Sequence, residues 1–331
     1  MNIGCIGAGS WGTTLAVYLA ERGHSVVLWA HNTEQQVALR KERENRQYLP
    51  GITFPERLQI INDLLPIASS EAVVIATPTQ YIRSAIHSLA SLDTRNTLFV
   101  NTSKGIERGT LMRVSEVLTD VLKLSGDQIV SLSGPSHAEE VSRSDPAALV
   151  AGSRSLESAK LTQQLFNSET LRIYRSDDII GVELGGALKN VIALCAGIVD
   201  GLEFGDNTKA ALITRGLAEI TRLGVALGAR SGTFSGLSGL GDLIVTCTSR
   251  HSRNRYVGEQ IGRGRNLEEI VQEMSMVAEG VTTTESAYAL AQRVGIEMPI
   301  IEQVHSVLFE QKGTREAISD LMSRSTKPET W

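Results

Sequence analysis

The sequence lacks the cysteine and histidine groupings that form disulfides or hold metals. Its three cysteines, Cys5, Cys195 and Cys247, are far apart, odd in number and form no C-x-x-C pair. They indicate neither a disulfide framework nor a zinc site. The six histidines form no H-x-x-x-H or H-E-x-x-H group, which argues against a bound metal. A reducing, cytoplasmic location fits this composition.

Excess positive charge and long apolar runs are also missing. The formal net charge is −5, which argues against a broad nucleic-acid surface. We see no apolar run approaching the roughly 20 residues of a membrane span, and the first residues already have the pattern of a strand, so no targeting segment is expected. With 331 residues, 42% of them hydrophobic, the chain can bury a substantial core in two domains.

The first 30 residues have the pattern of a strand, a turn, a helix and a second strand. A short apolar run leads into Gly7-Ala8-Gly9-Ser10-Trp11-Gly12, which has the G-x-G-x-x-G spacing. In that spacing the first glycine permits a tight turn, the second lets the backbone approach a pyrophosphate, and the third lets the helix pack on the strand. Since an apolar strand precedes the glycines and an amphipathic helix follows, we predict a dinucleotide-binding βαβ unit.

The second strand, 25–30, ends without the acidic residue that usually holds the ribose 2′-hydroxyl of NAD. His31 stands there, and Arg40, Lys41 and Arg43 follow on the next expected helix. These residues would tolerate a 2′-phosphate, although His31 is equally explained as a solvated loop residue. The sequence therefore predicts NAD or NADP without choosing between them.

Strands and helices alternate in the next part of the chain, which is typical of a doubly wound α/β domain. Residues 33–46 read as a polar helix that Leu49-Pro50-Gly51 breaks. Further strands are expected at 58–61, 72–76, 96–101, 127–133, 147–151 and 171–174. Further helices are expected at 81–89, 111–124 and 156–166, and another follows the turn 134–136 and runs through about 141.

The pattern changes at about residue 179, where strand signals end and 3.6-residue periodicity begins. Helices are expected at 182–199, 208–227, 266–274, 284–294 and 300–309, with loops at 235–242 and 246–255. We therefore expect a dinucleotide-binding Rossmann-like domain at 1–178 and an all-α substrate-binding domain at 179–331.

Several polar or glycine-marked turns follow expected parallel strands. They are the glycine turn, Thr77-Pro78, Lys104 and the turn 133–136. In open parallel sheets ligands collect beyond the carboxyl ends of the strands, which is the edge these turns share. Each turn alone has an ordinary structural explanation, but together they predict a cofactor site.

Lys189 and Asn190 are the only strongly polar residues in an otherwise small or apolar helical stretch, 185–194. Burial would favour the neutral amine and lower the lysine pKa toward neutrality, the range that a general acid or base needs. A nearby cation such as Lys104 would act in the same direction. The alternative is a lysine that extends along the helix to reach water. The small residues 185–187 allow close approach of the first domain and favour the functional reading.

Residues 248–255 concentrate arginines and hydroxyl groups after a glycine-rich loop that contains Asp242. Arginine forks and hydroxyls suit a small dianion such as a phosphate ester. A solvated helix start and a local nucleic-acid contact are the alternatives, and the latter is disfavoured because no aromatic residues are interleaved. No base lies near Cys247 in the sequence, so we expect it to pack rather than react.

Six stretches in order, GAGSWGTTLA, NTSKGIE, SLSGPSHAEE, ELGGALKNVIA, GLSGLGDLIVTCTSRHSRNR and VAEGVTTT, resemble the bacterial-type NAD(P)-dependent glycerol-3-phosphate dehydrogenases across nearly the whole chain. The resemblance implies reversible reduction of dihydroxyacetone phosphate to sn-glycerol 3-phosphate, which supplies glycerophospholipid synthesis. It also implies a homodimer. The residue after His31 is often basic in that family but is Asn32 here. This departure argues against a strong preference for NADP.

The resemblance also implies roles for individual residues. Lys189 matches the proton acceptor, and Lys104 lies at both substrate and cofactor as a second catalytic candidate. The implied cofactor contacts are Ser10, Trp11, His31, Lys104, Ala138, Arg253, Val277 and Glu279. They add to Gly7, Gly9 and Gly12, which the G-x-G-x-x-G spacing predicts. The implied substrate contacts are Lys104, Gly134, Ser136, Asp242, Ser252, Arg253 and Asn254. We add Lys189 and Asn190 as substrate contacts, because they are the polar residues of the apolar stretch 185–194.

Two other functions remain open at this point. A related β-hydroxyacid or 6-phosphogluconate-like dehydrogenase would share both domains and a helix-borne lysine, and dependence on the substrate phosphate would distinguish it. A dinucleotide sensor without turnover would need neither a lysine in an apolar helix nor a second anion site.

Overall fold

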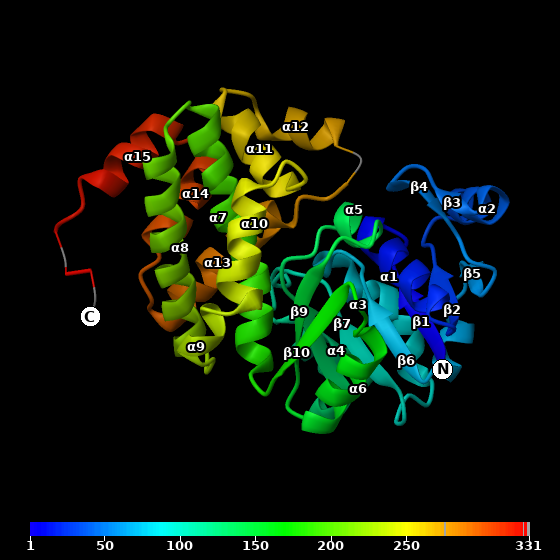
Figure 1. Ribbon diagram of the computed structural model, residues 1–331. Helices are drawn as coiled ribbons and strands as arrows, with labels where there is room; N and C mark the ends of the chain where they lie inside the picture. The colour runs from blue at the N-terminus through cyan, green and yellow to red at the C-terminus, as the bar shows by residue number, and fades with distance from the viewer. Residues whose placement is uncertain (275, 327, 330–331) are drawn as a thin grey trace.

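The computed structural model describes all residues except 275, 327, 330 and 331 and has two parts, a sheet with its helices and a helical part (Figure 1). Eight strands form one sheet in the order β10-β9-β8-β7-β6-β1-β2-β5. Their bounds are β1 (Asn2–Ile6), β2 (Ser25–Trp29), β5 (Leu58–Ile61), β6 (Ala72–Ile75), β7 (Leu98–Asn101), β8 (Ile129–Ser133), β9 (Ala147–Gly152) and β10 (Leu171–Ser176). Each expected strand is present, with ends shifted by up to two residues.

Helices cover both faces of this sheet, which confirms the doubly wound prediction. Side chains of α1, α2 and α6 pack on one face, and those of η1, α3 and α4 pack on the other. The bounds are α1 (Ser10–Glu21), α2 (Thr33–Glu42), η1 (Leu65–Ser69), α3 (Thr79–Ile86), η2 (His87–Ser91), α4 (Val114–Leu122), η3 (Gly126–Gln128), α5 (Ala138–Val141) and α6 (Leu156–Phe166).

One part of the sheet differs from a purely parallel arrangement. Strands β5, β2, β1, β6, β7 and β8 are parallel, but β9 pairs antiparallel with β8. A parallel neighbour needs a long crossover, usually a helix. The connection from β8 to β9 holds only the single turn α5, so the chain reverses direction, whereas α6 provides the crossover that makes β10 parallel to β9.

The prediction of one helix over 33–46 was wrong at its end. Helix α2 stops at Glu42, and a small hairpin follows, β3 (Glu44–Asn45) paired with β4 (Leu49–Thr53). Arg43 adopts a left-handed conformation with φ of 53°. Its guanidinium donates to the carbonyls of residues 54, 55 and 58, which stabilises the chain reversal.

From residue 179 the described chain is helical, as expected, and α7 is the central helix of this part (Figure 1). The two predicted loops are mostly helical instead. Glycines such as Gly239 permit tight packing of these turns. The bounds are α7 (Ile179–Gly201), α8 (Asp206–Ala226), α9 (Ser231–Phe234), the π-helical turn η4 (Leu237–Gly241), α10 (Asp242–Thr248), α11 (Arg253–Gly262), α12 (Leu267–Glu273), α13 (Glu279–Val294), α14 (Pro299–Phe309) and α15 (Thr314–Met322).

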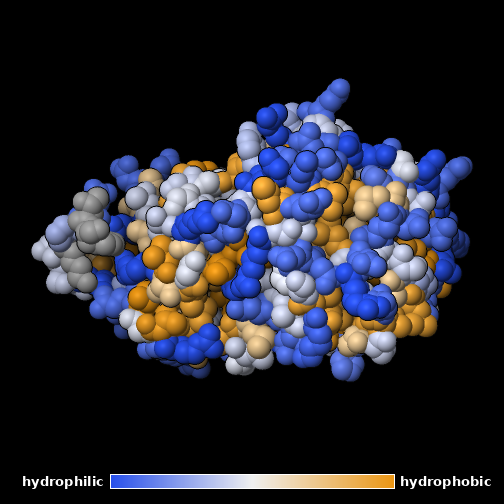
Figure 2. All heavy atoms as spheres, turned by 90° about the horizontal axis from the view of Figure 1, so that it is seen from below, coloured by the Kyte–Doolittle hydropathy of each residue, from blue (hydrophilic) through white to orange (hydrophobic). Residues whose placement is uncertain are grey.

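Helix α7 is long and apolar enough, by length and composition, to cross a membrane, contrary to our reading of the sequence. However, 94% of its apolar window is buried inside the protein, which is typical of a core helix. The helices around it supply the covering side chains. On the face seen in Figure 2, hydrophilic and hydrophobic groups are mixed.

Candidate active site

The glycine turn joins β1 to α1 and needs its glycines for different reasons. Gly7 has φ of +118°, a conformation that side chains rarely adopt. A Cβ on Gly12 would lie 1.9 Å from the Gly7 oxygen, so this position requires glycine for close packing of α1. A Cβ on Gly9 would meet nothing within 4 Å. Gly9 therefore exposes backbone to open space at the N-terminus of α1, as anion binding requires.

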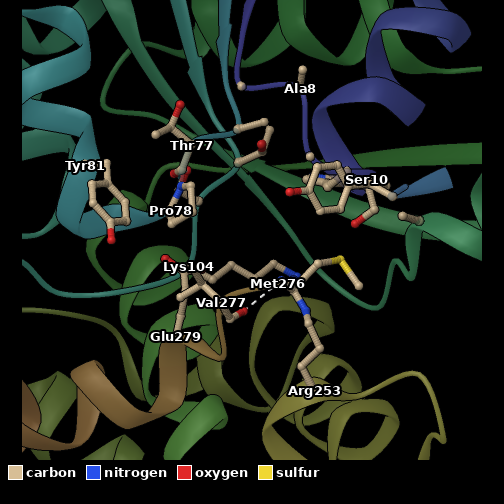
Figure 3. Close-up of a pocket in the computed structure, with 18 of the residues that line it drawn as sticks. Ala8, Ser10, Thr77, Pro78, Tyr81, Lys104, Arg253, Met276, Val277 and Glu279 are labelled. Atoms are coloured by element: carbon tan, nitrogen blue, oxygen red, sulfur yellow. Dashed lines mark hydrogen bonds between the residues drawn. The ribbon is translucent and has the colours of Figure 1, made fainter. Parts of the chain in front are cut away.

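A cleft of about 940 Å³ runs from this turn to the helical part of the molecule. Its walls include the ends of β1, β2, β6 and β7, the start of α5, and residues of α7, α10 and α11. Figure 3 shows Ser10, Thr77 and Tyr81 on one side of the cleft and Lys104, Arg253 and Glu279 on the other. Thus the polar turns predicted at the sheet edge share one cavity.

Lys189 lies in the middle of α7 and is only 5% exposed. Its Nζ donates to Asp242 Oδ1 and to Thr246 Oγ1, the latter at 2.5 Å, and both partners are on α10. Asp242 is 1% exposed, and its Oδ2 accepts a hydrogen bond of 2.7 Å from Lys104 Nζ. One buried carboxylate therefore joins two ammonium groups from different parts of the chain. We call Lys104, Asp242 and Lys189 the lysine cluster.

Burial and charge set the protonation of this cluster. Burial lowers the pKa of Lys189 to about 8, and the Lys104 ammonium acts in the same direction, while Asp242 opposes it. Burial alone would raise the pKa of Asp242, but the two ammonium groups hold it below its usual range. The carboxylate therefore stays ionised, and Lys189 is the member able to lose or gain a proton near neutral pH.

Small residues on α7 bring the cluster together. A Cβ on Gly186 would lie 2.7 Å from Ser133 Oγ at the end of β8, so this glycine allows the approach to the sheet that we predicted. Gly185 faces the Ser238 oxygen of η4 instead, within the helical part. Lys104 is oriented further because its Nζ donates to the Gly134 oxygen at 3.1 Å. The same oxygen also accepts a hydrogen bond from Ser136 Oγ.

The two asparagines predicted to contact substrate are bonded to each other. Asn254 Nδ2 donates to Asn190 Oδ1 at 2.9 Å, and Asn254 Oδ1 accepts from the Gly280 N–H. Asn190 Nδ2 donates to the Lys104 oxygen at 3.1 Å. These bonds tie α7, α11 and α13 to the segment after β7, so both side chains hold the walls of the cleft in position.

Helix α11 begins at the cleft. Ser252 is its N-cap and accepts from the Arg255 N–H, and Arg253 donates to the Val277 oxygen at 2.8 Å, as drawn in Figure 3. The first N–H groups of a helix have no partner within it, and the helix dipole favours an anion there. The predicted anion site thus has backbone donors as well as an arginine.

The remaining predicted cofactor contacts also line the cleft: Ser10, Trp11, His31, Ala138, Val277 and Glu279. Glu279 Oε1 accepts from the Thr79 N–H at 2.7 Å, which links the start of α13 to the start of α3. Thr14 Oγ1 donates to the Ser10 oxygen and, at 3.4 Å, to the Ala138 oxygen, which joins α1 to α5.

The basic residues expected near His31 are not in the cleft. Arg40 Nε donates to the Ile60 oxygen at 2.7 Å, and Arg43 donates to the carbonyls of residues 54, 55 and 58, which follow the hairpin. Asn32 caps α2, since its Oδ1 accepts from the N–H groups of Glu34 and Gln35. Arg40 and Arg43 therefore bind backbone carbonyls in this structure and are not among the residues that line the cleft.

Sequence reasoning missed Thr246, His137 and His251, which also line the cleft. Thr246 lies one helical turn after Asp242, an i, i+4 spacing that would have placed both on one face had this segment been read as a helix. The rings of His137 and His251 lie 5.8 Å apart. Burial, helped by Lys189, lowers the pKa of His137.

Cys247 is fully buried, and burial raises the pKa of its thiol to about 12. This agrees with a packing role. Within the described residues, no group of three or more His, Cys, Asp or Glu side chains is placed to hold a metal ion.

Comparison with known proteins gives consistent results over the whole chain. Residues 2–159 and 178–319 match the models of the N-terminus and C-terminus of NAD-dependent glycerol-3-phosphate dehydrogenase. Enzymes named glycerol-3-phosphate dehydrogenase [NAD(P)+] from Pelodictyon phaeoclathratiforme and Syntrophotalea carbinolica are each 53% identical over 99% of both chains. The crystal structure of glycerol-3-phosphate dehydrogenase from Coxiella burnetii is 37% identical, covers 98% of this chain and 99% of its own, and superposes with a TM-score of 0.93. D-mandelate dehydrogenase, at 11% identity and a TM-score of 0.64, shares the fold alone.

Proposed function

This chain belongs to the NAD-dependent glycerol-3-phosphate dehydrogenase family, and on that premise we propose how its own residues carry out the reaction. The protein is an NAD(P)-dependent oxidoreductase that interconverts dihydroxyacetone phosphate and sn-glycerol 3-phosphate. The lysine cluster is the observation on which the residue assignments rest, since Lys104 and Lys189 line the same cleft as the glycine turn.

The glycine turn and the cleft fit a dinucleotide. The backbone at Gly9 is open to the cavity, and α1 presents its N-terminus there, which suits a pyrophosphate. The implied contacts from Ser10, Trp11, His31, Ala138, Val277 and Glu279 line the same cavity. When bound, the nicotinamide supplies or accepts the hydride.

Lys189 moves the proton. In oxidation, the neutral Nζ accepts the proton of the hydroxyl on carbon 2 of glycerol 3-phosphate. In reduction, its ammonium form returns a proton to the oxygen that develops negative charge. A pKa of about 8 makes both forms accessible near neutral pH.

Lys104 and Asp242 support this exchange. The Lys104 ammonium polarises the substrate oxygen, and Asp242 holds both lysine nitrogens toward one point while its charge offsets theirs. Thr246 fixes the direction of the Lys189 amine from the other side. Asp242 is therefore a positioning residue in this account, whereas the resemblance alone implied a substrate contact.

The start of α11 holds the substrate phosphate. Its free backbone N–H groups and the Arg253 guanidinium supply donors, and Ser252 and Asn254 keep the helix start in place through their own hydrogen bonds. Binding energy gained at the phosphate positions carbon 2 at the reacting end of the cleft. Ser136 lines the same cleft, and the Gly134 oxygen accepts a hydrogen bond from Lys104 Nζ.

We assign residues 1–178 to dinucleotide binding and residues 179–331 to substrate binding. The cofactor contacts and the substrate contacts meet in the cleft. A homodimer, a cytoplasmic location and a role in supplying glycerophospholipid synthesis complete the proposal. Nucleic acid has no part in it. The β-hydroxyacid dehydrogenase and the dinucleotide sensor are not favoured, since full-length relatives carry the glycerol-3-phosphate dehydrogenase name.

The test is to mix purified protein with dihydroxyacetone phosphate and NADH or NADPH and to follow the nicotinamide absorbance. We expect turnover with dihydroxyacetone phosphate and much less with dihydroxyacetone, which lacks the phosphate. Equal rates with both ketones would contradict a phosphate site at α11. No turnover with either would contradict the enzyme assignment.

A further inference from the structure

The chain between β7 and α4, residues 102–113, carries Lys104 near its start and then folds back on itself. Ile106 forms an antiparallel bridge with Arg113, the last residue before α4. Lys104 therefore lies only two residues before a backbone bridge to Arg113. We call residues 102–113 the Lys104 segment. Whatever holds Arg113 in place also limits where the Lys104 backbone can lie.

Arg113 and the start of α4 bind a buried carboxylate that comes from α7. Glu183 is 8% exposed, and its Oε2 accepts from an Arg113 Nη at 2.6 Å and from Ser115 Oγ at 2.6 Å. Its Oε1 accepts from the Ser115 N–H at 2.8 Å, in the first turn of α4, where the helix dipole favours negative charge. The other Arg113 Nη donates to Glu116 at 2.8 Å. We call Arg113, Ser115 and Glu183 the α4–α7 clamp.

The Lys104 segment meets α7 at a second place. Asn190 Nδ2 donates to the Lys104 oxygen at 3.1 Å, and a Cβ on Gly186 would lie 3.5 Å from Lys104 Cγ. Positions 183, 186 and 190 have the i, i+3, i+7 spacing that places residues on one face of a helix. The two ends of this face are about 10 Å apart along the axis, at 1.5 Å per residue. The segment is therefore fixed to α7 over two helical turns.

The adjoining face of α7 contacts the rest of the lysine cluster. Gly185 faces the Ser238 oxygen of η4, and Lys189 donates to Asp242 on α10. Helix α7 is thus the common support of both lysines, because Lys189 belongs to it and Lys104 is held against it. Since Asp242 accepts from both Nζ atoms, the geometry of the lysine cluster depends on how the Lys104 segment lies on α7.

Stability alone does not explain a buried ion pair at this place. Burial raises the pKa of Glu183, and the Arg113 guanidinium and the donors of Ser115 oppose that rise. The charge on Glu183 therefore depends on its partners in the clamp. Well-packed apolar residues in place of a buried ion pair are often as stable or more so, whereas a buried pair can specify one register between the elements that it joins.

We propose that Arg113, Ser115 and Glu183 are positioning residues for the reaction. They fix the Lys104 segment on α7 so that Lys104 and Lys189 converge on Asp242. None of the three clamp residues is among those that line the cleft, so they act through Lys104 and not on a ligand. This inference rests on the proposed function for the roles of the two lysines.

Loosening the clamp should change the Lys189 amine in a definite direction. The charged and titratable groups that act on this amine or respond to it are Lys104, Asp242, Cys247 and His137. Lys104 lowers the pKa of Lys189, and Asp242 raises it. If Lys104 withdraws, the pKa of Lys189 should therefore rise. Loss of the Glu183 charge acting directly through space would do the opposite, because it removes a negative charge that favours the ammonium form.

Glu183→Gln tests the proposal, since it keeps the shape of the side chain and removes its charge. With dihydroxyacetone phosphate and NADH, we expect kcat to fall about tenfold and the Kd for NADH to change less than about twofold, because misplaced reacting groups slow the chemical step. Quenching of Trp11 and Trp29, which line the cleft, measures that Kd. The pH at which kcat/KM for glycerol 3-phosphate is half-maximal should move upward.

Arg113→Lys keeps the test decisive if Glu183→Gln does not fold. It retains a positive charge but loses the planar fork that reaches both Glu183 and Glu116. We expect kcat to fall and the half-maximal pH to rise, both by less than in Glu183→Gln. Parent-like values of kcat and of the half-maximal pH in this variant would count against the clamp.

The matched control is Glu219→Gln. Glu219, on α8, is also a buried carboxylate at a helix start, since both its oxygens accept from the Ile300 N–H of α14. Both glutamine variants should lower Tm, but only Glu183→Gln should lower kcat. Equal loss of kcat in the two variants, a parent-like kcat in Glu183→Gln, or a half-maximal pH that stays or moves downward would overturn the inference. Absence of turnover in the parent protein would instead contradict the proposed function.

Discussion

The two ends of the cleft hold ligands by different means. At the glycine turn the binding groups belong to the backbone, at the open position of Gly9 and at the N-terminus of α1. At the lysine cluster the ligand meets three charged side chains. Asp242 lies 53 residues from Lys189 and 138 residues from Lys104 in the sequence, and the fold brings all three together. The residues of a backbone site are consecutive in the sequence, whereas a cluster of side chains forms only in the tertiary fold.

This difference predicts which property of the enzyme a substitution at each end of the cleft should change. Removing a group from the lysine cluster should lower the rate of the chemical step, since the charges there act on the reacting atoms. Altering the glycine turn should change dinucleotide affinity or stability and leave the chemical step nearly intact. The following variants test that division, beginning with the largest effect.

Replacing Lys189 by alanine removes the proposed proton carrier. We expect kcat to fall by roughly 10² to 10⁴, the usual range for loss of a general acid or base, with little change in the Kd for NADH. Steady-state kinetics and fluorescence titration measure the two quantities. The matched control is Lys160→Ala on the exposed side of α6. Near-normal turnover in the Lys189 variant would remove this amine from the mechanism.

Asp242→Asn keeps the shape of the side chain and removes its charge. We expect kcat to fall by about 10², since removing one buried interaction with charged groups costs about 3 kcal/mol. Because Asp242 raises the pKa of Lys189, the variant should also reach its half-maximal oxidation rate at a lower pH than the parent. A shift to higher pH would contradict the assigned coupling, and the exposed Asp145→Asn serves as the control.

Arg253→Ala tests the phosphate end of the substrate site. We expect KM for dihydroxyacetone phosphate to rise about tenfold while kcat changes less, since a charge-assisted hydrogen bond contributes about 1.5 to 3 kcal/mol. Arg250, exposed before the start of α11, provides the matched alanine control. An unchanged KM would move the phosphate site away from Arg253.

Two glycine variants separate packing from binding at the glycine turn. Gly12→Ala should lower Tm, because its Cβ would lie 1.9 Å from the Gly7 oxygen and overpacking costs about 1 to 3 kcal/mol. Gly9→Ala should leave Tm nearly unchanged, since nothing lies within 4 Å of its Cβ, and should weaken NADH binding several-fold. Thermal unfolding and fluorescence titration distinguish them. Equal loss of Tm in both variants would contradict the separate roles.

Much of the sheet was predictable from the sequence, because buried parallel strands appear as short apolar runs. The direction of β9 was not, since it depends on how little chain joins it to β8. The hairpin after α2 was also missed, because the carbonyl contacts of Arg43 that stabilise it come from residues 11 to 15 positions away. Because we predicted loops at 235–242 and 246–255, we missed helix α10. We therefore also missed that Thr246 lies one helical turn after Asp242.

The chemistry was predictable only in part. A lysine among small and apolar residues pointed to Lys189, and the G-x-G-x-x-G spacing located the dinucleotide turn. The sequence did not indicate that Asp242 joins both lysines, because Lys104 and Asp242 are 138 residues apart. Nor did it indicate that Arg40 and Arg43 bind backbone carbonyls, since composition alone cannot distinguish a committed cation from a free one.

The central claim is that the buried amine of Lys189 exchanges the reaction's proton, and the pH dependence of kcat/KM in the two directions tests it most directly. With NAD, kcat/KM for glycerol 3-phosphate should rise as the pH passes about 8, where the amine becomes neutral. With NADH, kcat/KM for dihydroxyacetone phosphate should fall across the same range. Profiles that change in the same sense in both directions, or that stay flat across this range, would contradict the account.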